Sequence, residues 1–322
     1  MTVIIAAPPG MKDIRAVAGA KAMQYPAEKL EIIVTRGRQP SVQRNTALRA
    51  ARGEIIYFLD DDSVPLPGNL QRAVEQFSRP EVKMVGGPNL CPSDSTNLQK
   101  AFSVTMGTKL AFGPSAARYR SFGKVRETSE KEIILCNLLG RRDAMLELGG
   151  FNEKLYPNEE NALMDELQKR GGKLIYDPEL IVYRHPRPTL KAFCKMLMNY
   201  GRGRAEQFRL HPTINSAANF IPPLFVLYLL GIVLLWGYDI YDDPKGGPIS
   251  FIFLPPLVAY AVANLVQGVV AVGARRILWL PLIMFLIFLS HILYGLGFWR
   301  GCFTKPKPPT QSTAAEIKLE RV

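Results

Sequence analysis

Three long apolar stretches in the last third of the chain constrain its fold more than any other feature. They cover residues 220–238, 251–273 and 277–299. Each is long enough, as a helix, to cross the roughly 30 Å hydrocarbon core of a bilayer. Backbone polar groups inside a bilayer must be satisfied within the segment itself, so these stretches predict membrane helices. The roughly two hundred residues before them are enough for a separate soluble domain.

The formal net charge of +12 predicts a partner with negative charge. Beside membrane helices, we expect that partner to be anionic lipid headgroups or phosphorylated lipids. The sequence contains no RNA- or DNA-binding motif, so we expect no nucleic acid partner. The four cysteines are scattered without metal-ligand spacing and predict no disulfide framework.

Residues 55–59 (IIYFL) are predicted to form a buried strand that ends in three consecutive aspartates, Asp60, Asp61 and Asp62. Ligands of open α/β sheets bind beside the carboxyl ends of the strands. Three adjacent carboxylates repel one another, and a hard cation such as Mg²⁺ or Mn²⁺ would relieve that repulsion. An acidic turn that caps the next helix explains the same residues equally well.

Strand and helix patterns alternate through the first sixty residues. Apolar runs at 3–7, 30–34 and 55–59 predict strands, and the segments 13–23 and 41–51 between them predict helices. This alternation predicts an α/β domain with a parallel sheet and right-handed crossovers.

Further motifs follow in a fixed order along the chain. They are Arg44-Asn45, Gly53-Glu54, Phe58-Leu59-Asp60-Asp61-Asp62, Gly149-Gly150-Phe151-Asn152-Glu153 and Glu159-Glu160. Together they resemble the family 2 glycosyltransferases of the GT-A fold, over most of residues 1–205. The resemblance implies a Rossmann-like, mostly parallel sheet flanked by helices, followed by an all-α transmembrane domain. This architecture is similar to the glucosyltransferases of succinoglycan-type exopolysaccharide assembly.

The resemblance also implies roles for particular residues. Asp60 would contact the nucleotide or a metal ion, and Asp62 would coordinate Mg²⁺ or Mn²⁺ directly. The other nucleotide-sugar contacts it implies are Pro8, Arg44, Asn45 and Asp61. His185, which follows a later predicted strand, is a candidate metal or diphosphate ligand, although a lone histidine more commonly serves as a structural hydrogen-bonding residue.

Glu159 and Glu160 begin a predicted helix after Asn158. Acidic residues in a first turn are ordinary partners of the helix dipole, so the pair has a purely structural explanation. The resemblance implies instead that Glu160 is the general base that takes the proton of the acceptor hydroxyl. Family members carry Glu-Asp at this place, and the longer second side chain here leaves Glu159 as the alternative base. An inverting single displacement needs one such base and no covalent nucleophile.

The motifs and the apolar stretches together predict a domain order. Residues 1–187 form the GT-A domain, 188–218 a basic amphipathic interface helix and linker, 219–300 a transmembrane domain of about three helices, and 301–322 a flexible tail. Arg202 and Arg204 in the amphipathic segment are candidate phosphate or acceptor contacts. Within residues 92–131, only a helical stretch around 98–110 has a regular pattern.

The charges between the apolar stretches predict an orientation. Arg275 and Arg276 lie between the second and third stretch, whereas acidic residues dominate the connection between the first and second. The positive-inside rule therefore places the soluble domain on the cytoplasmic side of a bacterial inner membrane. The basic residues after the third stretch conflict with three full crossings, so either the rule is broken there or one segment is re-entrant. Polar residues within the stretches, Asn264, Gln267 and His291, are expected to form interhelical hydrogen bonds.

The sequence therefore predicts an inverting, metal-dependent glycosyltransferase. It would move a sugar from a UDP- or GDP-linked donor to a polyprenyl-linked acceptor in polysaccharide or glycan assembly, in contact with membrane lipids. A first alternative is a polyprenyl-phosphate glycosyltransferase that charges the lipid carrier itself. A second is a non-catalytic membrane scaffold that binds nucleotide sugar.

Overall fold

The computed structural model describes residues 1–155, 158–210, 212, 214–242, 248–304 and 317–322. The chain divides into two compact units. The sheet unit comprises Met1–Thr96, Pro114–Pro186 and Pro306–Val322, and the helical unit comprises Asn97–Gly113 and Arg187–Lys305. The chain thus leaves the sheet unit twice and returns to it twice.

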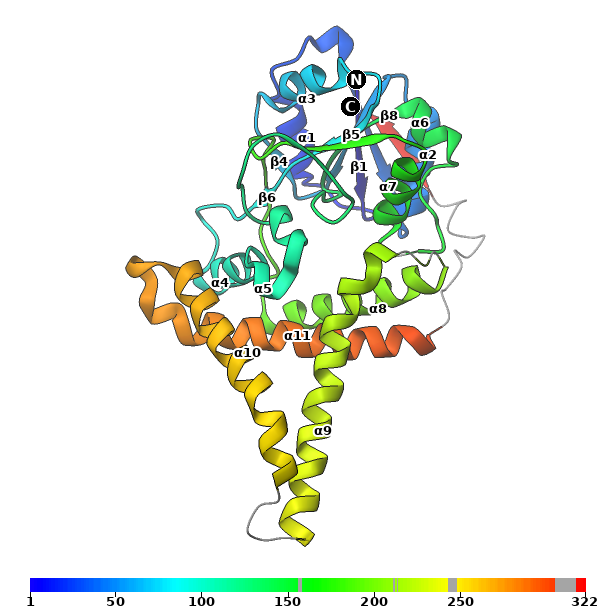
Figure 1. Ribbon diagram of the computed structural model, residues 1–322. Coiled ribbons are helices and arrows are strands. Elements are labelled where there is room, and N and C mark those ends of the chain that lie inside the picture. Colours follow the sequence, from blue (N-terminus) through cyan, green and yellow to red (C-terminus); the bar gives the residue numbers. More distant parts are fainter. Residues whose placement is uncertain (156–157, 211, 213, 243–247, 305–316) are drawn as a thin grey trace. The chain divides into compact units, whose positions relative to one another are not determined.

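An eight-stranded sheet forms the core of the sheet unit (Figure 1), with the strand order β11-β2-β1-β3-β8-β5-β9-β7. The first three strands along the chain pair in parallel, with β1 between β2 and β3. β8 lies antiparallel between β3 and β5, so the sheet is mixed beyond β3. The bounds are β1 Thr2–Ala7, β2 Glu31–Arg36, β3 Ile55–Asp60, β5 Val82–Gly86, β7 Arg126–Thr128, β8 Asn137–Arg141, β9 Lys173–Tyr176 and β11 Lys318–Arg321.

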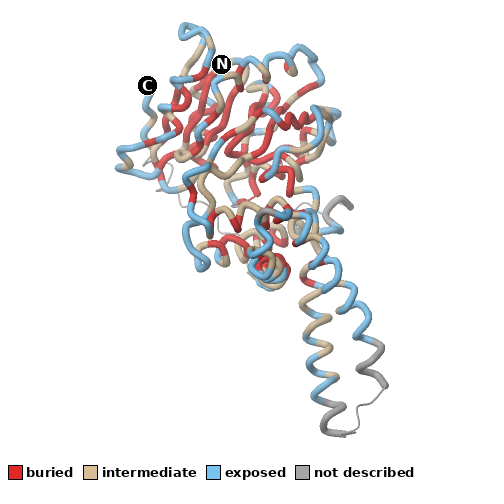
Figure 2. The backbone as a smooth tube through the Cα atoms, turned by 90° about the vertical axis from the view of Figure 1, so that its left-hand side faces the viewer, coloured by how far each residue is buried: buried red, intermediate tan, exposed pale blue. Residues whose placement is uncertain are grey.

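Helices cover the sheet and bury its apolar residues, as the burial colours of Figure 2 show. In β3 the apolar run at 56–59 is buried on both faces, which explains why it reads as a continuous apolar stretch. The ring of Phe58 meets that of Phe151 edge to face at 5.1 Å between centroids. The helices are α1 Arg15–Lys21, α2 Pro40–Ala50, α3 Asn69–Phe77, α6 Arg142–Glu147 and α7 Glu159–Lys169.

A small second sheet holds the chain that follows the aspartate triplet. It consists of β4 (Val64–Pro65), β10 (Val182–Tyr183) and β6 (Asn89–Leu90), with β10 in the middle. β4 and β10 are antiparallel, and Val64 is paired with Tyr183. The pairing brings the residues just before β4 close to the residues just after β10.

The helical unit contains all three apolar stretches as helices. Its elements are α4 Asn97–Met106, α5 Lys109–Phe112, α8 Leu190–Leu210, α9 Ile221–Asp242, α10 Pro248–Val272 and α11 Leu280–Phe303. By length and composition, Ala217–Gly237, Phe253–Val272 and Arg276–Phe303 could each cross a membrane. Within this unit, α9 and α10 extend together as a hairpin, while α11 runs beside α8 and crosswise to that hairpin (Figure 1).

The polar residues of these helices form hydrogen bonds between helices, as the sequence predicted. Asn264 Nδ2 donates to the Met284 carbonyl at 3.0 Å. The two ring nitrogens of His291 lie 2.8 Å from the Tyr260 hydroxyl and 2.8 Å from the Leu110 carbonyl. Each contact gives a partner to a polar group that lies among apolar helices.

The structure departs from the predicted domain order in two places. Residues 97–113, predicted within the GT-A domain, belong to the helical unit. Of the predicted flexible tail, Lys318–Arg321 form strand β11 at the edge of the large sheet, and residues 305–316 lie outside the described residues. A four-residue strand next to a polar segment has too little pattern to be recognised without its partner strand.

Candidate active site

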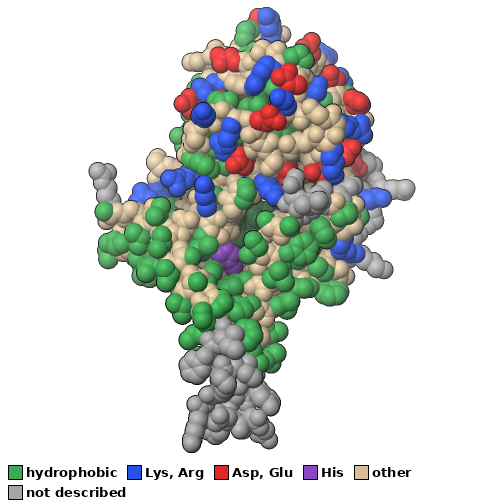
Figure 3. All heavy atoms as spheres, viewed as in Figure 1, with side chains coloured by type: hydrophobic (Ala, Val, Ile, Leu, Met, Phe, Trp, Pro, Cys, Tyr) green, Lys and Arg blue, Asp and Glu red, His purple; other side chains and the backbone are tan. Residues whose placement is uncertain are grey.

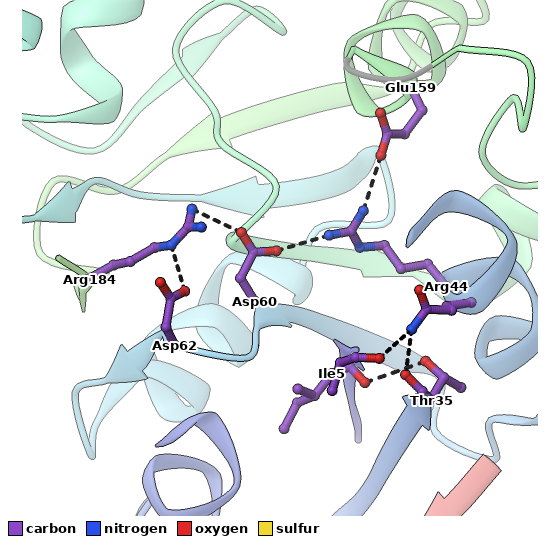
Figure 4. Close-up of polar contacts among 9 residues, drawn as sticks. Ile5, Thr35, Arg44, Asp60, Asp62, Glu159 and Arg184 are labelled. Atoms are coloured by element: carbon purple, nitrogen blue, oxygen red, sulfur yellow. Dashed lines mark hydrogen bonds and ion pairs between the residues drawn. The ribbon is translucent and has the colours of Figure 1, made fainter. Parts of the chain in front are cut away.

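Five charged side chains form a continuous line of ion pairs at the carboxyl end of β3 (Figure 4). Asp62 Oδ1 accepts from Arg184 Nε at 2.6 Å, and Arg184 Nη1 lies 2.9 Å from Asp60 Oδ2. The other oxygen of Asp60 accepts from Arg44 Nη2 at 2.9 Å, and Arg44 Nη1 contacts Glu159 Oε1 at 3.1 Å. This ion-pair chain links the aspartate triplet to the first residue of α7.

The turn after β3 fixes the aspartates. The Ser63 backbone N–H donates to the Asp60 carbonyl at 3.0 Å and closes a tight turn. The Asp61 carbonyl accepts from the Ala16 backbone N–H at 3.1 Å, which ties the same turn to α1. Since β4 then pairs with β10, Asp62 and Arg184 lie side by side although they are 122 residues apart in sequence.

Arg44 is held by α2, and α2 is anchored to the sheet by the neighbouring residue. Gln43 Nε2 donates to the Ala7 carbonyl at 2.9 Å and to the Thr35 carbonyl at 2.7 Å, at the ends of β1 and β2. The Arg44 side chain is only 7% exposed and the Glu159 side chain 2%. The two side chains are therefore held in one arrangement, because separating them would leave a buried polar group without its partner, at a large cost in free energy.

Burial changes the titration of two carboxyl groups of the site. It raises the pKa of Glu159 to about 8, with the charge of Glu160 adding to the rise and Arg44 opposing it. Burial also raises the pKa of Asp61, and the neighbouring Asp62 and Asp60 carboxylates add to the effect. The neighbouring carboxylates of the triplet thus disfavour one another's charged form, and a bound cation would relieve this repulsion.

The second acid of the pair, Glu160, is half-buried and lies in a different environment from Glu159. Its Oε1 accepts from Asn161 Nδ2 at 3.1 Å. The residue before the helix, Asn158, has φ 96°, in the left-handed region that few residues other than glycine adopt. Asn158 is at the N-cap position but its side chain forms no capping hydrogen bond to the helix backbone. The backbone thus turns sharply just where the two acids begin.

Three of the predicted nucleotide contacts, Asp61, Asn45 and Pro8, are not members of the ion-pair chain. Asn45 Nδ2 donates to the Phe151 carbonyl and to Glu153 Oε1, both at 2.9 Å, and its Oδ1 accepts from the Phe151 N–H. Asn45 therefore docks the glycine-containing loop before α7 onto α2. Pro8 is exposed after the end of β1, and its carbonyl accepts from the Met11 N–H at 3.4 Å.

The remaining predicted residues form other contacts. His185 Nδ1 lies 2.9 Å from Ser95 Oγ, and its Nε2 lies 3.7 Å from Asp94. In the helical unit, Arg202 faces Glu206 at 3.7 Å and Arg204 donates to Gln207 at 3.2 Å. The metal-ligand role of His185 and the phosphate roles of the two arginines stay predictions.

Arg184 is the member of the site that sequence reasoning missed. It directly precedes His185 and follows the short strand β10, where no sequence pattern distinguishes it from an ordinary polar residue after a strand. The aspartate triplet itself could have indicated such a residue, because a cluster of acids at the end of a buried strand requires a positive charge nearby.

The residues at the triplet fit a divalent metal that also binds substrate. Within the described ranges, no group of three or more His, Cys, Asp or Glu side chains is arranged to hold a metal ion. Asp60 and Asp62 nevertheless offer two carboxylates, and a cationic guanidinium already lies between them. Mg²⁺ is commonly bound by one or two carboxylates together with substrate phosphates, so this donor set suits it.

Comparison with known proteins gives the family. The model of the family described as "Glycosyltransferase like family 2" matches residues 1–198. The chain is 24% identical over 205 residues to the succinoglycan biosynthesis protein ExoA of Rhizobium meliloti (strain 1021), which is 64% of this chain and 57% of that protein. It is 25% identical over 173 residues to a pre-mycofactocin glycosyltransferase of Mycobacterium tuberculosis, which is 54% of this chain and 36% of that protein. The chain thus spans less than two thirds of the length of either relative.

A solved structure has a similar fold. It is the mannosyltransferase PcManGT from Pyrobaculum calidifontis in complex with GDP-Man and Mn²⁺, with a TM-score of 0.54 and 16% identity, covering 90% of this chain and 85% of that one. The predicted fold class, an α/β GT-A domain with apolar C-terminal helices, is therefore confirmed. Since the family model matches more than half of the chain, the protein belongs to glycosyltransferase-like family 2.

Proposed function

We propose that this glycosyltransferase transfers a sugar, with inversion, from a nucleoside-diphosphate sugar to a lipid-linked acceptor at the cytoplasmic face of a bacterial membrane. The observation that carries the proposal is the ion-pair chain, which joins the aspartate triplet to the acids of α7 within one site. Donor binding at one end and proton removal at the other are the two functions that a single displacement requires.

The aspartate end of the chain suits the donor diphosphate. Asp60 and Asp62 would hold a divalent metal together with diphosphate oxygens. When bound, the metal supplies electrostatic stabilisation of the negative charge that develops on the departing nucleoside diphosphate. Arg184 lies between the two carboxylates, so its guanidinium is placed to contact the diphosphate once a metal takes over the neutralisation of the acids.

The α7 end suits the acceptor hydroxyl. Glu159 is buried against Arg44, so we assign it the positioning of the helix start rather than contact with substrate. Glu160 is half-buried, follows the left-handed Asn158, and has the position implied for the general base. Its carboxylate would take the proton of the attacking hydroxyl while the sugar leaves the diphosphate.

A lipid-linked acceptor is supported by the helical unit. On the face that Figure 3 shows, green apolar side chains gather over the described parts of the apolar helices, and Ile221, Leu234 and Val270 are each about two-thirds exposed, at 64–65%. Large exposed apolar surfaces mark contact with lipid or another apolar partner. The relative named for succinoglycan biosynthesis and the complex of PcManGT with GDP-Man and Mn²⁺ favour polysaccharide assembly from a nucleotide sugar with a metal.

Glu160→Gln separates the proposed donor and acceptor roles. We expect the variant to bind nucleotide sugar with Mn²⁺ as tightly as the wild type in calorimetry, while transfer falls by roughly 10²- to 10⁴-fold, because a general base contributes about that much. The matched control is Glu166→Gln on the same helix, which removes an exposed carboxylate paired with Arg170. Near-full transfer by Glu160→Gln would refute its assignment as the base.

A further inference from the structure

The last strand of the chain, β11, is paired with the sheet unit. It runs antiparallel to β2, with Lys318 opposite Arg36 and Arg321 opposite Ile33. Glu320 Oε1 accepts from Arg36 Nε at 2.8 Å, and Arg321 Nε donates to Glu31 Oε1 at 2.9 Å. Four backbone pairs and two ion pairs define the register, so β11 is a specific part of this sheet.

This pairing limits how often the chain can cross a membrane. The chain leaves the sheet unit before α8 and is part of it again at β11, so both ends of the helical unit are on one side of the bilayer. An even number of crossings is therefore required between them. Residues 305–316, KPKPPTQSTAAE, are too polar and too rich in proline to supply a further crossing.

Of the three apolar helices, α11 differs from the other two in its packing. Within the apolar windows, 28% of residues are buried in α11, against 6% in α9 and 11% in α10. Ile283, Leu286 and Ile287 are fully buried, and glycines line its contact with α8. Of the side chains that the structure describes in α9 and α10, in contrast, most are half-buried or exposed.

The contact between α8 and α11 brings their backbones together. A Cβ atom at Gly201 of α8 would lie 2.8 Å from the Phe298 nitrogen, and one at Gly301 of α11 would lie 2.8 Å from the Ala205 Cβ. Gly297 and Gly301 are four residues apart, as are Gly201 and Ala205, so small residues face each other on both helices. The two helices must therefore lie at the same depth.

The charges of α8 set that depth. α8 carries basic residues along its whole length, and charged side chains are costly within the hydrocarbon core. The residues are Lys191, Lys195, Arg202, Arg204 and Arg209. Since α8 belongs at the headgroup level, the part of α11 that contacts its backbone belongs there too.

The middle of α11 is held at the same side by another segment. The ring of His291 is hydrogen-bonded to the Leu110 carbonyl of α5. Residues 97–113, which carry α4 and α5, are preceded and followed in the chain by residues of the sheet unit, and they are too few to cross a bilayer and return. Contact with this segment is incompatible with a position of His291 at the centre of a crossing helix.

From these contacts we propose that the chain crosses the bilayer only twice, through α9 and α10, and that α11 lies in the plane of the membrane surface. The exposed face of α11, with Leu282, Phe285 and Leu296, would rest on the acyl chains, and α8 would lie on its opposite side at the headgroups. The basic residues that conflict with three crossings then face the same side as the sheet unit, as the positive-inside rule requires.

Labelling of single cysteines tests the number of crossings in the full chain. Cys91, Cys194 and Cys302 are replaced by serine, and buried Cys136 is kept. Single cysteines then replace Glu28, Lys245 or Val322 and are labelled with a membrane-impermeant maleimide in sealed vesicles of each orientation. We expect 28 and 322 to react from one side and 245 from the other. Reaction of 322 from the side opposite to 28 would establish an odd number of crossings and overturn the proposal, as would reaction of all three from one side.

Spin labels measure the tilt of α11 independently. Labels at Leu282 and Leu296 are 14 residues apart, about 21 Å along the helix. The matched pair at Ile221 and Leu234 of α9 is separated by about 20 Å, and all four positions are exposed. Oxygen accessibility should give equal depths to within about 5 Å for the α11 pair and depths that differ by most of 20 Å for the α9 pair. A depth difference in α11 as large as in α9 would contradict the in-plane position, and neither experiment depends on glycosyl transfer.

Discussion

The two ends of the ion-pair chain contain the same chemical groups in different surroundings. The Asp62 side chain is 39% exposed and that of Arg184 22%, whereas Arg44 and Glu159 are 7% and 2% exposed. Ion pairs near water exchange partners at little cost in free energy. Removing one partner of a buried pair, in contrast, lowers the free energy of unfolding by several kcal/mol. The exposed end is thus suited to bind and release ligands, and the buried end to keep α2 and α7 in a fixed position.

The buried end is tested first, by Arg44→Met. The substitution removes the hydrogen bonds that Arg44 donates to Glu159 and Asp60, so we expect the free energy of unfolding to fall by about 3 kcal/mol. Thermal unfolding of the detergent-solubilised protein measures the change. Arg52→Met is the control, since that side chain is 79% exposed and its pair with Glu31 is 4.0 Å long. Equal effects of the two substitutions would contradict the distinction between the two ends.

The exposed end is tested by Arg184→Gln. Without the guanidinium, Asp62 loses its arginine partner and Asp60 keeps only Arg44, so Mn²⁺ should bind about tenfold more tightly in the absence of nucleotide, or ~1.4 kcal/mol. Calorimetric titration with Mn²⁺ gives the affinity directly, and Arg170→Gln, at an exposed arginine just after α7, should leave it unchanged. Weaker or unchanged Mn²⁺ binding by Arg184→Gln would mean that Arg184 does not compete for the two acids.

The titration of Glu159 gives a smaller effect on stability. Its pKa is raised from 4.5 to about 8 in the folded protein. Below pH 4.5 the carboxyl is protonated in both states, and as pH rises from there to about 8 the unfolded chain releases the proton while the folded chain keeps it. Folded-state stability should therefore fall across this window. Glu159→Gln cannot titrate, so its unfolding midpoint should vary less with pH over the same range. A wild-type slope that persists in the variant would assign the pH dependence to other groups.

Much of the site could be predicted from sequence, because its residues are fixed by local patterns. The buried run of β3 and the prolines after it place Asp60, Asp61 and Asp62 at a strand end, and the start of α7 is marked by Asn158 and two acids. Arg44 also joins the predicted group. These residues need only strand and helix periodicity, together with the order of motifs, to be located.

The rest depends on contacts between distant segments. Arg184 reaches Asp62 only because β10 pairs with β4, and Asn45 serves the loop at Phe151 because α2 packs against it. β11 has no recognisable pattern without β2. The composition of α11 is the same as that of a crossing helix, and the close approach of Gly201 to its backbone is not visible in hydropathy. Sequence patterns report local periodicity, and these features are set by tertiary packing.

Asp62→Asn tests the central claim, which is that the exposed end of the ion-pair chain is the donor site. The measurement is release of UDP or GDP from a panel of nucleotide sugars, with Mn²⁺ and a membrane lipid extract as the source of acceptor. We expect release by the wild type with at least one donor, its loss when EDTA removes the metal, and a fall of roughly 10²- to 10³-fold in Asp62→Asn, as found when a group that stabilises developing charge is removed. Release by Asp62→Asn at the wild-type rate would contradict the assignment.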